Sequence, residues 1–565
     1  MFDTFPSSID SIMQWSWAQI EPYYQDLNER PLATDTVEQW LRDWTRLYDA
    51  LSEWGARLRL ATNRNTNDIE AEQAFKHYLD AILPPKQTAD NQLTQRFLQS
   101  GLTVEGFAIA QRDMKAEAEL FRETNLPLIS AEQKQALAYM KVVGNEQVKW
   151  QGRTLTMQQL EGELSHSERA HREQAWRLMM ETHLADREAI NAIWSELVNI
   201  RSQIATNAGL STYRDYAWKR RLRFDYTPDD CYRFHESIEQ VVVPAAQRLY
   251  DWRRQQLGVD VLRPWDIAVD VTGKPALNPF DSVEELIARA TDIFNQLDPQ
   301  LGAYFQTMQD LDLMDVENRA GKAPGAFCTS FDITRVPYIF ANAVGKHRDI
   351  ITLVHECGHA FHTFESGHLP YHQQGWMPME FLEVPSQAME LLTLPYLDRF
   401  YDEADRARAT FEQLERVLTF WPYMAVVDGF QHWVYENQAE AQDAANCDHV
   451  WGQLWDRFMV GIDWSGLEAA KVTGWHRKRH IFRAPFYYVE YGMAYLGAVQ
   501  VWQNARQDQT QALKAYRHAM QLGGTVNLPH LYEAANLRFA FDADTLQRAV
   551  DLLENELQQL TRLLS

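Results

Sequence analysis

Cysteine is scarce in this sequence and long apolar runs are missing, and each absence limits what the chain can be. The four cysteines among 565 residues show no C-x-x-C spacing, which argues against a disulfide framework and favours a reducing compartment. No run of about 18 uncharged apolar residues occurs, and the first residues lack the basic and apolar segments of a secretory signal. We therefore expect a cytoplasmic protein that does not bind a membrane.

Basic residues are also fewer than acidic ones. The chain has 54 Lys and Arg against 78 Asp and Glu, a net charge of −24 at pH 7. A field of this sign repels phosphate backbones, so we expect no nucleic-acid partner. The acidity most simply serves solubility, and steering of basic substrates is the sharper alternative.

The length and composition predict a large globular protein. Hydrophobic residues make up 45% and charged residues 23%, and 565 residues exceed one typical domain. Residues 1–195 have the pattern of packed amphipathic helices, and we expect an N-terminal helical domain there and a second domain over residues 196–565. The clearest helical stripe lies in residues 35–60 and contains Trp40, Leu41, Trp44, Leu47, Tyr48 and Leu51.

The middle of the chain has a different pattern. Residues 257–286 contain several Pro and Gly and predict short strands and turns, after which Asp281 or Ser282 caps a helix. Two apolar, aromatic runs, 325–331 and 337–344, are separated by a turn-like DITR segment and predict a small sheet. Helices follow up to the C-terminus, so the predicted fold class is mainly α. The last helix has a seam that we expect to dock on its own domain, formed by Leu546, Val550, Leu553, Leu557, Leu560 and Leu564.

Residues 351–364, ITLVHECGHAFHTF, place two histidines four residues apart. In an α-helix His355 and His359 lie one turn apart on one face, where both imidazoles reach one metal ion, and zinc suits them. Glu356 projects to the side, the position of a general base for a metal-activated water. Gly358 is a weak helix former and indicates close approach of another backbone or a substrate. Three neighbouring histidines are assigned ordinary surface or loop roles: His362, His368 and His372.

A catalytic zinc takes three protein ligands and leaves one position open, so a third ligand is needed. The best candidate is Glu383 in MEFLEVPSQAMELL, at or just before the start of a helix whose first turn holds Pro385. Glu380 and Glu390 are alternatives. Glu390 lies on the same helical face as Glu383 and instead suits a hydrogen bond to a ligand histidine.

Several motifs together resemble the thimet oligopeptidase and oligoendopeptidase F family of zinc metallopeptidases, most closely its oligoendopeptidase F branch. They are HECGHAFH, EVPSQAMELL, HIFRAPFYYVEYGMAYLGA, GAFCTSF with PYIFAN, and GGTVNLPHLYEAA. The likeness covers roughly residues 200–560. It implies a mostly helical, two-lobed, zincin-like body with a deep substrate channel, and a small sheet beside the zinc helix.

The resemblance also implies roles for individual residues. His355, His359 and Glu383 would ligate one zinc ion, and Glu356 would be the general base. A histidine and tyrosines downstream would bind the substrate carbonyl and the developing oxyanion, and the matching residues are His480, Tyr488 and Tyr491, with Tyr487 and Tyr495 as alternatives. From the residues alone, Pro485 would open a helix on which Tyr488, Tyr491 and Tyr495 form a stripe, and such a stripe usually belongs to the core.

The resulting hypothesis is a zinc-dependent endopeptidase that hydrolyses internal bonds of short oligopeptides. The first alternative is a C-terminal exopeptidase, a carboxypeptidase or dipeptidyl carboxypeptidase, with the same zinc chemistry. The second is a non-catalytic, metal-stabilised scaffold that only binds peptides, which would be expected to lack Glu356. The strand at GAFCTSF is either an edge onto which an extended peptide adds or an ordinary paired strand.

Overall fold

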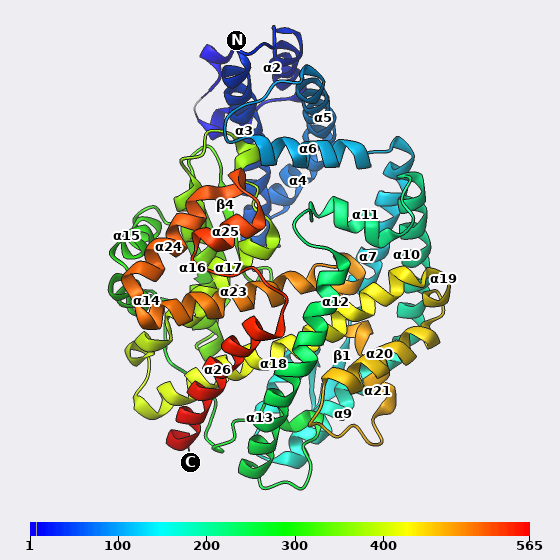
Figure 1. Ribbon diagram of the computed structural model, residues 1–565, viewed down its shortest axis with the longest axis vertical. Coiled ribbons are helices and arrows are strands. Elements are labelled where there is room, and N and C mark those ends of the chain that lie inside the picture. The colour runs from blue at the N-terminus through cyan, green and yellow to red at the C-terminus, as the bar shows by residue number, and fades with distance from the viewer. Residues whose placement is uncertain (7, 565) are drawn as a thin grey trace. The chain divides into compact units, whose positions relative to one another are not determined.

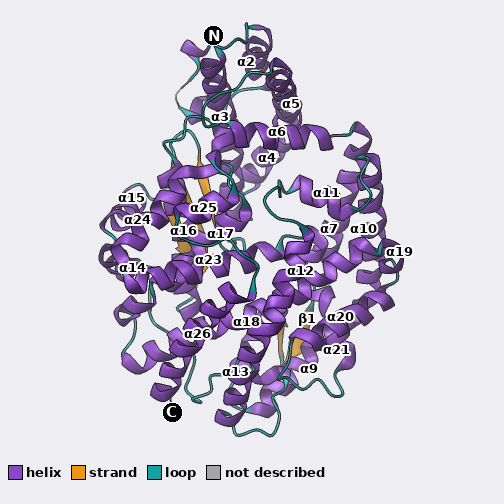
Figure 2. Cartoon of the chain, viewed as in Figure 1, coloured by secondary structure: helices purple, strands orange, loops and turns teal. Residues whose placement is uncertain are grey.

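The computed structural model describes residues 1–6 and 8–564 of the chain. Helices dominate and only short strands occur (Figures 1 and 2). The prediction of a mainly helical fold with a small sheet is confirmed. The chain forms two compact units, each built from three separate segments. Unit 1 comprises Met1–Glu119, Asn278–Asp402 and Gly497–Phe539, and unit 2 comprises Leu120–Leu277, Glu403–Leu496 and Ala540–Ser565.

Unit 1 contains the three-stranded sheet and most of the N-terminal helices. Its elements are α1 (Ile9–Ile12), α2 (Trp17–Glu29), α3 (Val37–Arg64), α4 (Ile69–His77), α5 (Leu83–Ser100), α6 (Ala108–Leu120), α14 (Val283–Leu297), α15 (Pro299–Asp310), β3 (Met314–Glu317), β4 (Phe327–Phe331), β5 (Val336–Ala343), α16 (His347–Ser366), α17 (Met379–Leu392), α24 (Gln509–Leu522) and α25 (Leu528–Ala534).

Unit 2 is built almost entirely of helices. Its elements are α7 (Leu126–Gly144), β1 (Gln147–Trp150), β2 (Arg153–Thr156), α8 (Met157–Glu161), α9 (Arg169–Ala185), α10 (Arg187–Asn207), α11 (Tyr213–Arg220), α12 (Pro228–Ser237), α13 (Val243–Gln256), α18 (Glu403–Glu436), α19 (Gln438–Ala441), α20 (Ala444–Phe458), α21 (Glu468–Val472), α22 (Arg479–Arg483) and α26 (Ala543–Leu564). Helix α23 (Tyr488–Gln507) is divided between the two units.

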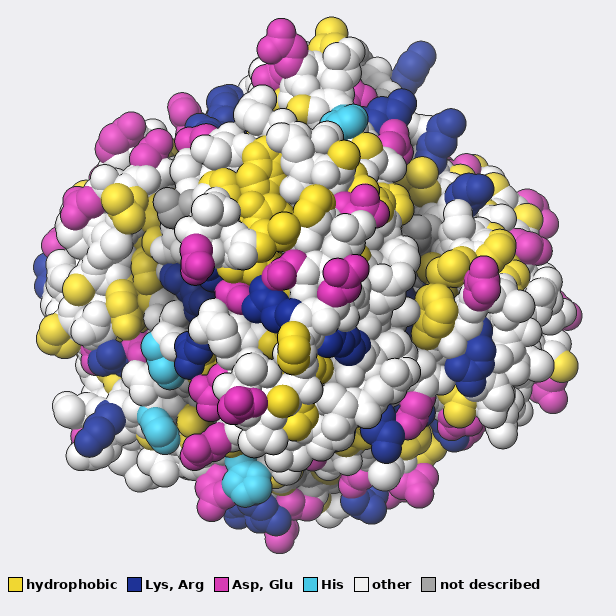
Figure 3. All heavy atoms as spheres, turned by 90° about the horizontal axis from the view of Figure 1, so that it is seen from above, with side chains coloured by type: hydrophobic (Ala, Val, Ile, Leu, Met, Phe, Trp, Pro, Cys, Tyr) yellow, Lys and Arg dark blue, Asp and Glu magenta, His cyan; other side chains and the backbone are white. Residues whose placement is uncertain are grey.

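The predicted domain boundary at residues 195/196 falls inside α10, and that division stays a prediction. Among the described residues, no helix is long and apolar enough to cross a membrane. The face of the molecule in Figure 3 has acidic side chains scattered among Lys and Arg.

The sheet of unit 1 has the order β3-β5-β4. Strand β5 is central, parallel to β3 and antiparallel to β4, and β4 is an edge strand. The predicted pair of runs therefore forms a hairpin, with Arg335 in the left-handed region (φ 56°) of its turn. Strand β3 was not predicted, because four residues are too few for a clear alternation.

In two of the predicted helices, α3 and α26, the apolar stripe is buried. In α3, Trp40, Trp44 and Leu51 are buried, and the Trp40 indole donates a hydrogen bond to the Leu27 carbonyl (2.8 Å). In α26, the seam is buried at Leu546, Val550, Leu553 and Leu557, and this helix packs on α18 of its own unit. The prediction that the last helix docks on its own domain is therefore confirmed.

The segment 257–286 forms no strand among its described residues, and that prediction was wrong. Its carbonyl groups are instead bound by arginine side chains of unit 2: Arg172 donates to the carbonyl of Trp265 (2.9 Å) and Arg253 to that of Val269 (2.7 Å). Because side chains satisfy these backbone acceptors, the segment needs no neighbouring strand. Ser282 caps α14 as one of the two predicted alternatives, accepting a hydrogen bond from the Glu285 amide (3.2 Å).

Helix α16 packs against α17 at very short range. A Cβ placed on Gly358 would lie 2.5 Å from the Cα of Ser386 and 2.6 Å from the carbonyl oxygen of Pro385. The expectation that Gly358 permits close approach of another backbone is confirmed. No larger residue fits, because the obstacle is backbone and not a flexible side chain.

We expect Gly358→Ala to separate α16 from α17 and to lower the free energy of unfolding by about 1–3 kcal/mol, the usual cost of overpacking a core. Thermal or urea unfolding of the purified protein measures this loss. The matched control is Gly144→Ala at the end of α7, where an added Cβ meets nothing within 4 Å. Equal stability of Gly358→Ala and wild type would contradict the close approach.

Candidate functional site

Two neighbouring helices of unit 1 bring three ligand-type side chains together. His355 and His359 lie one turn apart on α16, and Glu383 lies on α17. The Oε2 of Glu383 is 3.6 Å from the Nε2 of each histidine. All three ligand atoms lie within 4.8 Å of one another.

This spacing fits one divalent metal ion. Ligand atoms of a tetrahedral zinc, bound at 2.0–2.2 Å, stand about 3.3–3.6 Å apart. The two imidazoles and one carboxylate are a donor set that zinc accepts, and they leave a fourth position open. The residues present therefore fit the group that the sequence pattern implies.

Two further side chains hold the three in place. The Nδ1 of His355 is 2.7 Å from the Oε1 of Glu390, which directs Nε2 toward the centre of the group. Ser386 donates a hydrogen bond to the Oε2 of Glu383 (3.1 Å). The structure thus confirms that Glu390 contacts a histidine of the pair, and Glu380 does not belong to the group of ligand atoms.

Glu383 lies inside α17 and not at its start, so the expected helix boundary was wrong. The helix begins at Met379, and Pro385 lies in its interior. A proline there removes one backbone hydrogen bond of the helix. The carbonyl of Pro385 accepts a hydrogen bond from the hydroxyl of Tyr516 (3.0 Å) of α24, and the same turn meets Gly358, so packing on both sides holds the helix through the proline.

Glu356 is buried beside the histidine pair. Burial raises the pKa of its carboxyl to about 7, while His355 and a backbone hydrogen bond from Cys328 act against that rise. A carboxylate whose pKa lies near neutrality is suited to accept and return a proton at pH 7. For His355, burial opposes the charged form, but Glu390 and Glu383 raise the imidazole pKa to about 9.

A cavity of about 450 Å³ adjoins this group within unit 1. Strand β4 forms one wall and helix α3 another, and His359 and Glu383 lie at the metal-binding end. The other lining residues include Tyr48, Asp49, Ser52, Cys328, Thr329, Ser330, Asp332, Arg335, His362, Trp376 and Leu382. The sequence predicted Tyr48 to be core, and no local signal relates α3 to the histidine helix.

The neighbouring histidines differ from their predicted surface or loop roles in two cases. His362 is buried in α16, and burial lowers the pKa of its imidazole to about 4. His372 stacks on Tyr48 with ring centroids 3.8 Å apart. His368 is exposed, as predicted. His372 also lies 3.3 Å from the Thr45 hydroxyl of α3, and sequence spacing does not reveal this contact between distant segments.

His480, Tyr488 and Tyr491 come together in unit 2. The ring of His480 on α22 lies 5.2 Å from that of Tyr488 and 5.9 Å from that of Tyr491 on α23. Burial, aided by Lys478 and Arg479, lowers the pKa of His480 to about 3, so the ring is neutral. Burial raises the pKa of Tyr488, so its hydroxyl keeps its proton.

The alternatives Tyr487 and Tyr495 occupy different surroundings. Tyr487 contacts both His480 and Tyr491 (5.9 and 5.1 Å between ring centroids), so it remains an alternative. Tyr495 is buried, and its hydroxyl accepts a hydrogen bond from Arg416 (3.0 Å).

The loop before α23 is held by polar side chains that the sequence did not indicate. Helix α22 ends at Arg483, and Pro485 and Phe486 then form a turn in which Phe486 adopts a left-handed conformation (φ 63°). The expectation that Pro485 opens the helix was therefore wrong, because α23 begins at Tyr488. Gln431 accepts a hydrogen bond from the Phe486 amide (2.8 Å), and Arg223 donates to its carbonyl (2.5 Å). These partners come from segments distant in sequence.

The cavity is also lined by two acidic side chains, the buried Asp49 and the partly buried Asp332. Burial raises the pKa of Asp49 to about 8, and the charge of Asp332 adds to the rise, while Arg335 opposes it. A carboxyl group whose pKa is raised by folding stabilises the folded state below its unfolded pKa near 4, and this contribution is lost as the pH rises through 8.

We therefore expect Asp49→Asn to be more stable than wild type at pH 8 and to gain little at pH 5. The contribution of Asp49 should change the free energy of unfolding by at most about 1.4 kcal/mol per pH unit. Unfolding curves at both pH values test this, with Asp80→Asn on the exposed surface as the control. An equal effect of Asp49→Asn at both pH values would show that Asp49 is ionised in the folded protein.

Comparison with known proteins relates this geometry to a family. The chain is 22% identical over 356 residues to an oligoendopeptidase F homolog of Lactococcus lactis subsp. lactis (strain IL1403), which is 62% of this chain and 57% of that relative. It is 23% identical over 363 residues to the chromosomal oligoendopeptidase F of Lactococcus lactis subsp. cremoris, covering 63% of this chain and 58% of that relative. The matches thus span less than two thirds of these relatives.

A solved structure supports the same relationship over the whole chain. It is described as PZ peptidase A with inhibitor 2, has a TM-score of 0.87 and 26% identity, and the match covers 99% of each chain. The sequence model of peptidase family M3 matches residues 164–551, more than half of the chain. The chain, similar to oligoendopeptidase F proteins in sequence and to a solved peptidase in fold, belongs to peptidase family M3.

Proposed function

We propose that this protein is a zinc-dependent endopeptidase that cleaves internal bonds of short oligopeptides. The observation that carries the proposal is the group of His355, His359 and Glu383 beside the buried Glu356. His359 and Glu383 line a cavity that is bordered by an edge strand. Membership of peptidase family M3 supports it.

His355, His359 and Glu383 would hold the zinc ion, and Glu390 and Ser386 would orient two of these ligands. When bound, zinc polarises the substrate carbonyl and acidifies the attacking water. Glu383 and Glu390 place two carboxylates around the histidines, and this negative charge suits a divalent cation.

Glu356 is the proposed general base. Its carboxylate takes a proton from the attacking water and then delivers it to the nitrogen of the leaving amine, so its protonation state is restored at the end of each cycle. A pKa near 7 suits both transfers, because the carboxylate must accept the proton in one step and release it in the next.

Strand β4 is the proposed docking edge for the substrate main chain. It is an edge strand of the described sheet, and its residues Cys328–Phe331 line the cavity with His359 and Glu383. An extended peptide that pairs with this edge is bound through its main chain, which explains acceptance of varied sequences.

His480, Tyr488 and Tyr491 are proposed to stabilise the oxyanion of the substrate. The imidazole is neutral and the Tyr488 phenol is protonated near pH 7, so both can donate a hydrogen bond. Donors directed at a developing oxyanion stabilise the transition state by several kcal/mol.

The charges in the cavity favour an endopeptidase over a C-terminal exopeptidase. An exopeptidase needs a cation or an amide cluster for the terminal carboxylate, and Arg335 is the one Arg or Lys among the described residues lining the cavity. Arg335 donates hydrogen bonds to the carbonyls of Gly367 (2.9 Å) and Leu369 (2.8 Å), and its guanidinium is 3.7 Å from Asp49. These contacts and the acidic neighbours make it a poor carboxylate anchor.

The first test uses an internally quenched peptide of about nine residues, blocked at both ends. We expect wild type to cleave it internally and Glu356→Gln to be slower by about 100- to 10,000-fold, because general-base catalysis is lost. Both proteins should contain equal zinc, measured by elemental analysis.

The matched control is Glu365→Gln, a buried glutamate on the same helix that is bound by Arg517 (2.5 Å). It should retain activity. Cleavage only of peptides with a free C-terminus would establish the exopeptidase, and zinc binding without cleavage of any peptide would establish the scaffold.

A second test concerns the orientation of His355. We expect Glu390→Gln to weaken zinc binding by about 10- to 100-fold, because the charged partner of the ligand histidine is replaced by a neutral one. Competition with a chelator measures this affinity. Glu380→Gln is the control, a buried glutamate of the same helix outside the ligand group. Unchanged affinity in Glu390→Gln would remove Glu390 from the metal site.

A further inference from the structure

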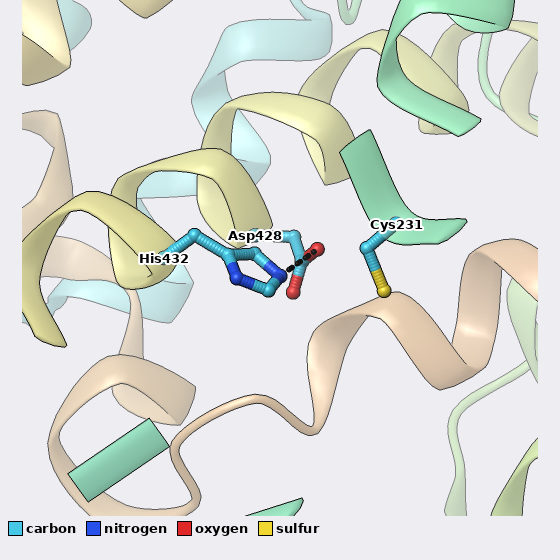
Figure 4. Close-up of side chains that lie close together, drawn as sticks. All are labelled: Cys231, Asp428 and His432. Atoms are coloured by element: carbon cyan, nitrogen blue, oxygen red, sulfur yellow. Dashed lines mark ion pairs between the residues drawn. The ribbon is translucent and has the colours of Figure 1, made fainter. Parts of the chain in front are cut away.

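A second group of ligand-type side chains lies in unit 2, away from the residues of the proposed reaction. Cys231 belongs to α12, and Asp428 and His432 belong to α18. Their sulfur, oxygen and nitrogen ligand atoms all lie within 4.8 Å of one another. Figure 4 shows the Asp428 carboxylate between the His432 ring and the Cys231 sulfur.

The local sequences explain how two helices present this group. On α12, Cys231 precedes His235 by four residues, and on α18 Asp428 precedes His432 by four. Each pair therefore lies on one face of its helix, one turn apart. The two helices pack against each other, so the two faces meet inside unit 2. Paired ligands from facing helices are a common way to build a metal site within a helical bundle.

The contacts inside the group leave polar atoms unsatisfied. The Nε2 of His432 is 3.3 Å from the Oδ2 of Asp428, but the contact lacks hydrogen-bond geometry. Both ring nitrogens of His432 and the Oδ1 of Asp428 have no hydrogen-bond partner among the described protein atoms. Both side chains are completely buried (0% exposed). Burying such groups without partners costs several kcal/mol in total.

A divalent cation would bind one ring nitrogen of His432 and a carboxylate oxygen of Asp428 together. The 3.3 Å separation between the His432 nitrogen and the Asp428 oxygen lies at the short end of the range for nitrogen and oxygen ligands of a tetrahedral zinc, about 3.3–3.6 Å. Aromatic rings surround His432, with centroid distances of 4.9 Å to Tyr232, 5.2 Å to Phe486 and 5.6 Å to Trp218. In such apolar surroundings the Asp428 charge is poorly solvated, and a bound cation would neutralise it.

His235 completes the arrangement from α12. Its Nε2 is 2.9 Å from the Oδ2 of Asp428, a hydrogen-bond distance and shorter than the usual separation of two zinc ligands. His235 therefore suits the role of fixing the carboxylate that binds the ion.

We propose that unit 2 binds a second zinc ion with a structural role, held by Cys231, Asp428 and His432, with His235 positioning the carboxylate. A thiolate, an imidazole and a carboxylate together suit zinc, whereas magnesium and calcium prefer oxygen ligands only. Two negative ligands and one neutral ligand leave the buried site without net charge. This ion would stabilise the packing of α12 on α18 and would not take part in peptide hydrolysis.

The test uses the full-length protein loaded with Co²⁺ as a spectroscopic probe. Cobalt bound to a thiolate gives a sulfur-to-metal charge-transfer absorption in the near ultraviolet, and the His355, His359 and Glu383 site contains no sulfur ligand. We expect this absorption in wild type and in His355→Ala, and its loss in Cys231→Ser. Elemental analysis of the zinc-loaded protein should give two zinc ions per chain in wild type and one in Cys231→Ser and in His355→Ala.

The matched control is Cys447→Ser, another completely buried cysteine of unit 2, whose thiol lies 3.3 Å from the Ala441 carbonyl. It should keep both the absorption and two zinc ions. If wild type lacks the absorption, the proposal is wrong. This result requires no variant, so the test holds even if Cys231→Ser fails to fold. Persistence of the absorption in folded Cys231→Ser would also overturn it.

Discussion

The close packing of α16 on α17 is the constraint on which the candidate active site depends. A glycine at position 358 lets the two backbones approach so closely that no side chain fits between them. This approach places Glu383 at 3.6 Å from both histidines, and it brings Glu390 into contact with the far side of His355. A wider separation of the helices would break the ligand group even though every ligand residue remained.

Buried charge is the second physical feature common to both proposed metal sites. In unit 1, three glutamates surround the histidine pair in a largely buried environment, and in unit 2 a fully buried carboxylate lies between two histidines. Such groups are unfavourable in a protein interior unless a positive charge offsets them. A divalent cation provides that charge at each place, and its binding energy would then contribute to the stability of the surrounding helices.

Hydrogen bonds to backbone groups and to side chains hold the site residues in place. Ser386 fixes Glu383, and Gln431 with Arg223 fixes the left-handed turn at Phe486 before the tyrosine helix. Arginine side chains likewise bind the carbonyls of the irregular segment 257–286.

The sequence by itself determined which side chains lie together on one face of a single helix. The spacing of His355, Glu356 and His359 maps onto one helical face because the helix repeats every 3.6 residues, and the apolar stripes of α3 and α26 are buried for the same reason. Only the tertiary structure decided which of three glutamates completes the ligand group, that α3 forms a wall of the cavity, and that Cys231 meets Asp428. Those contacts join segments far apart in the chain, and helix-to-helix packing, not local periodicity, sets them.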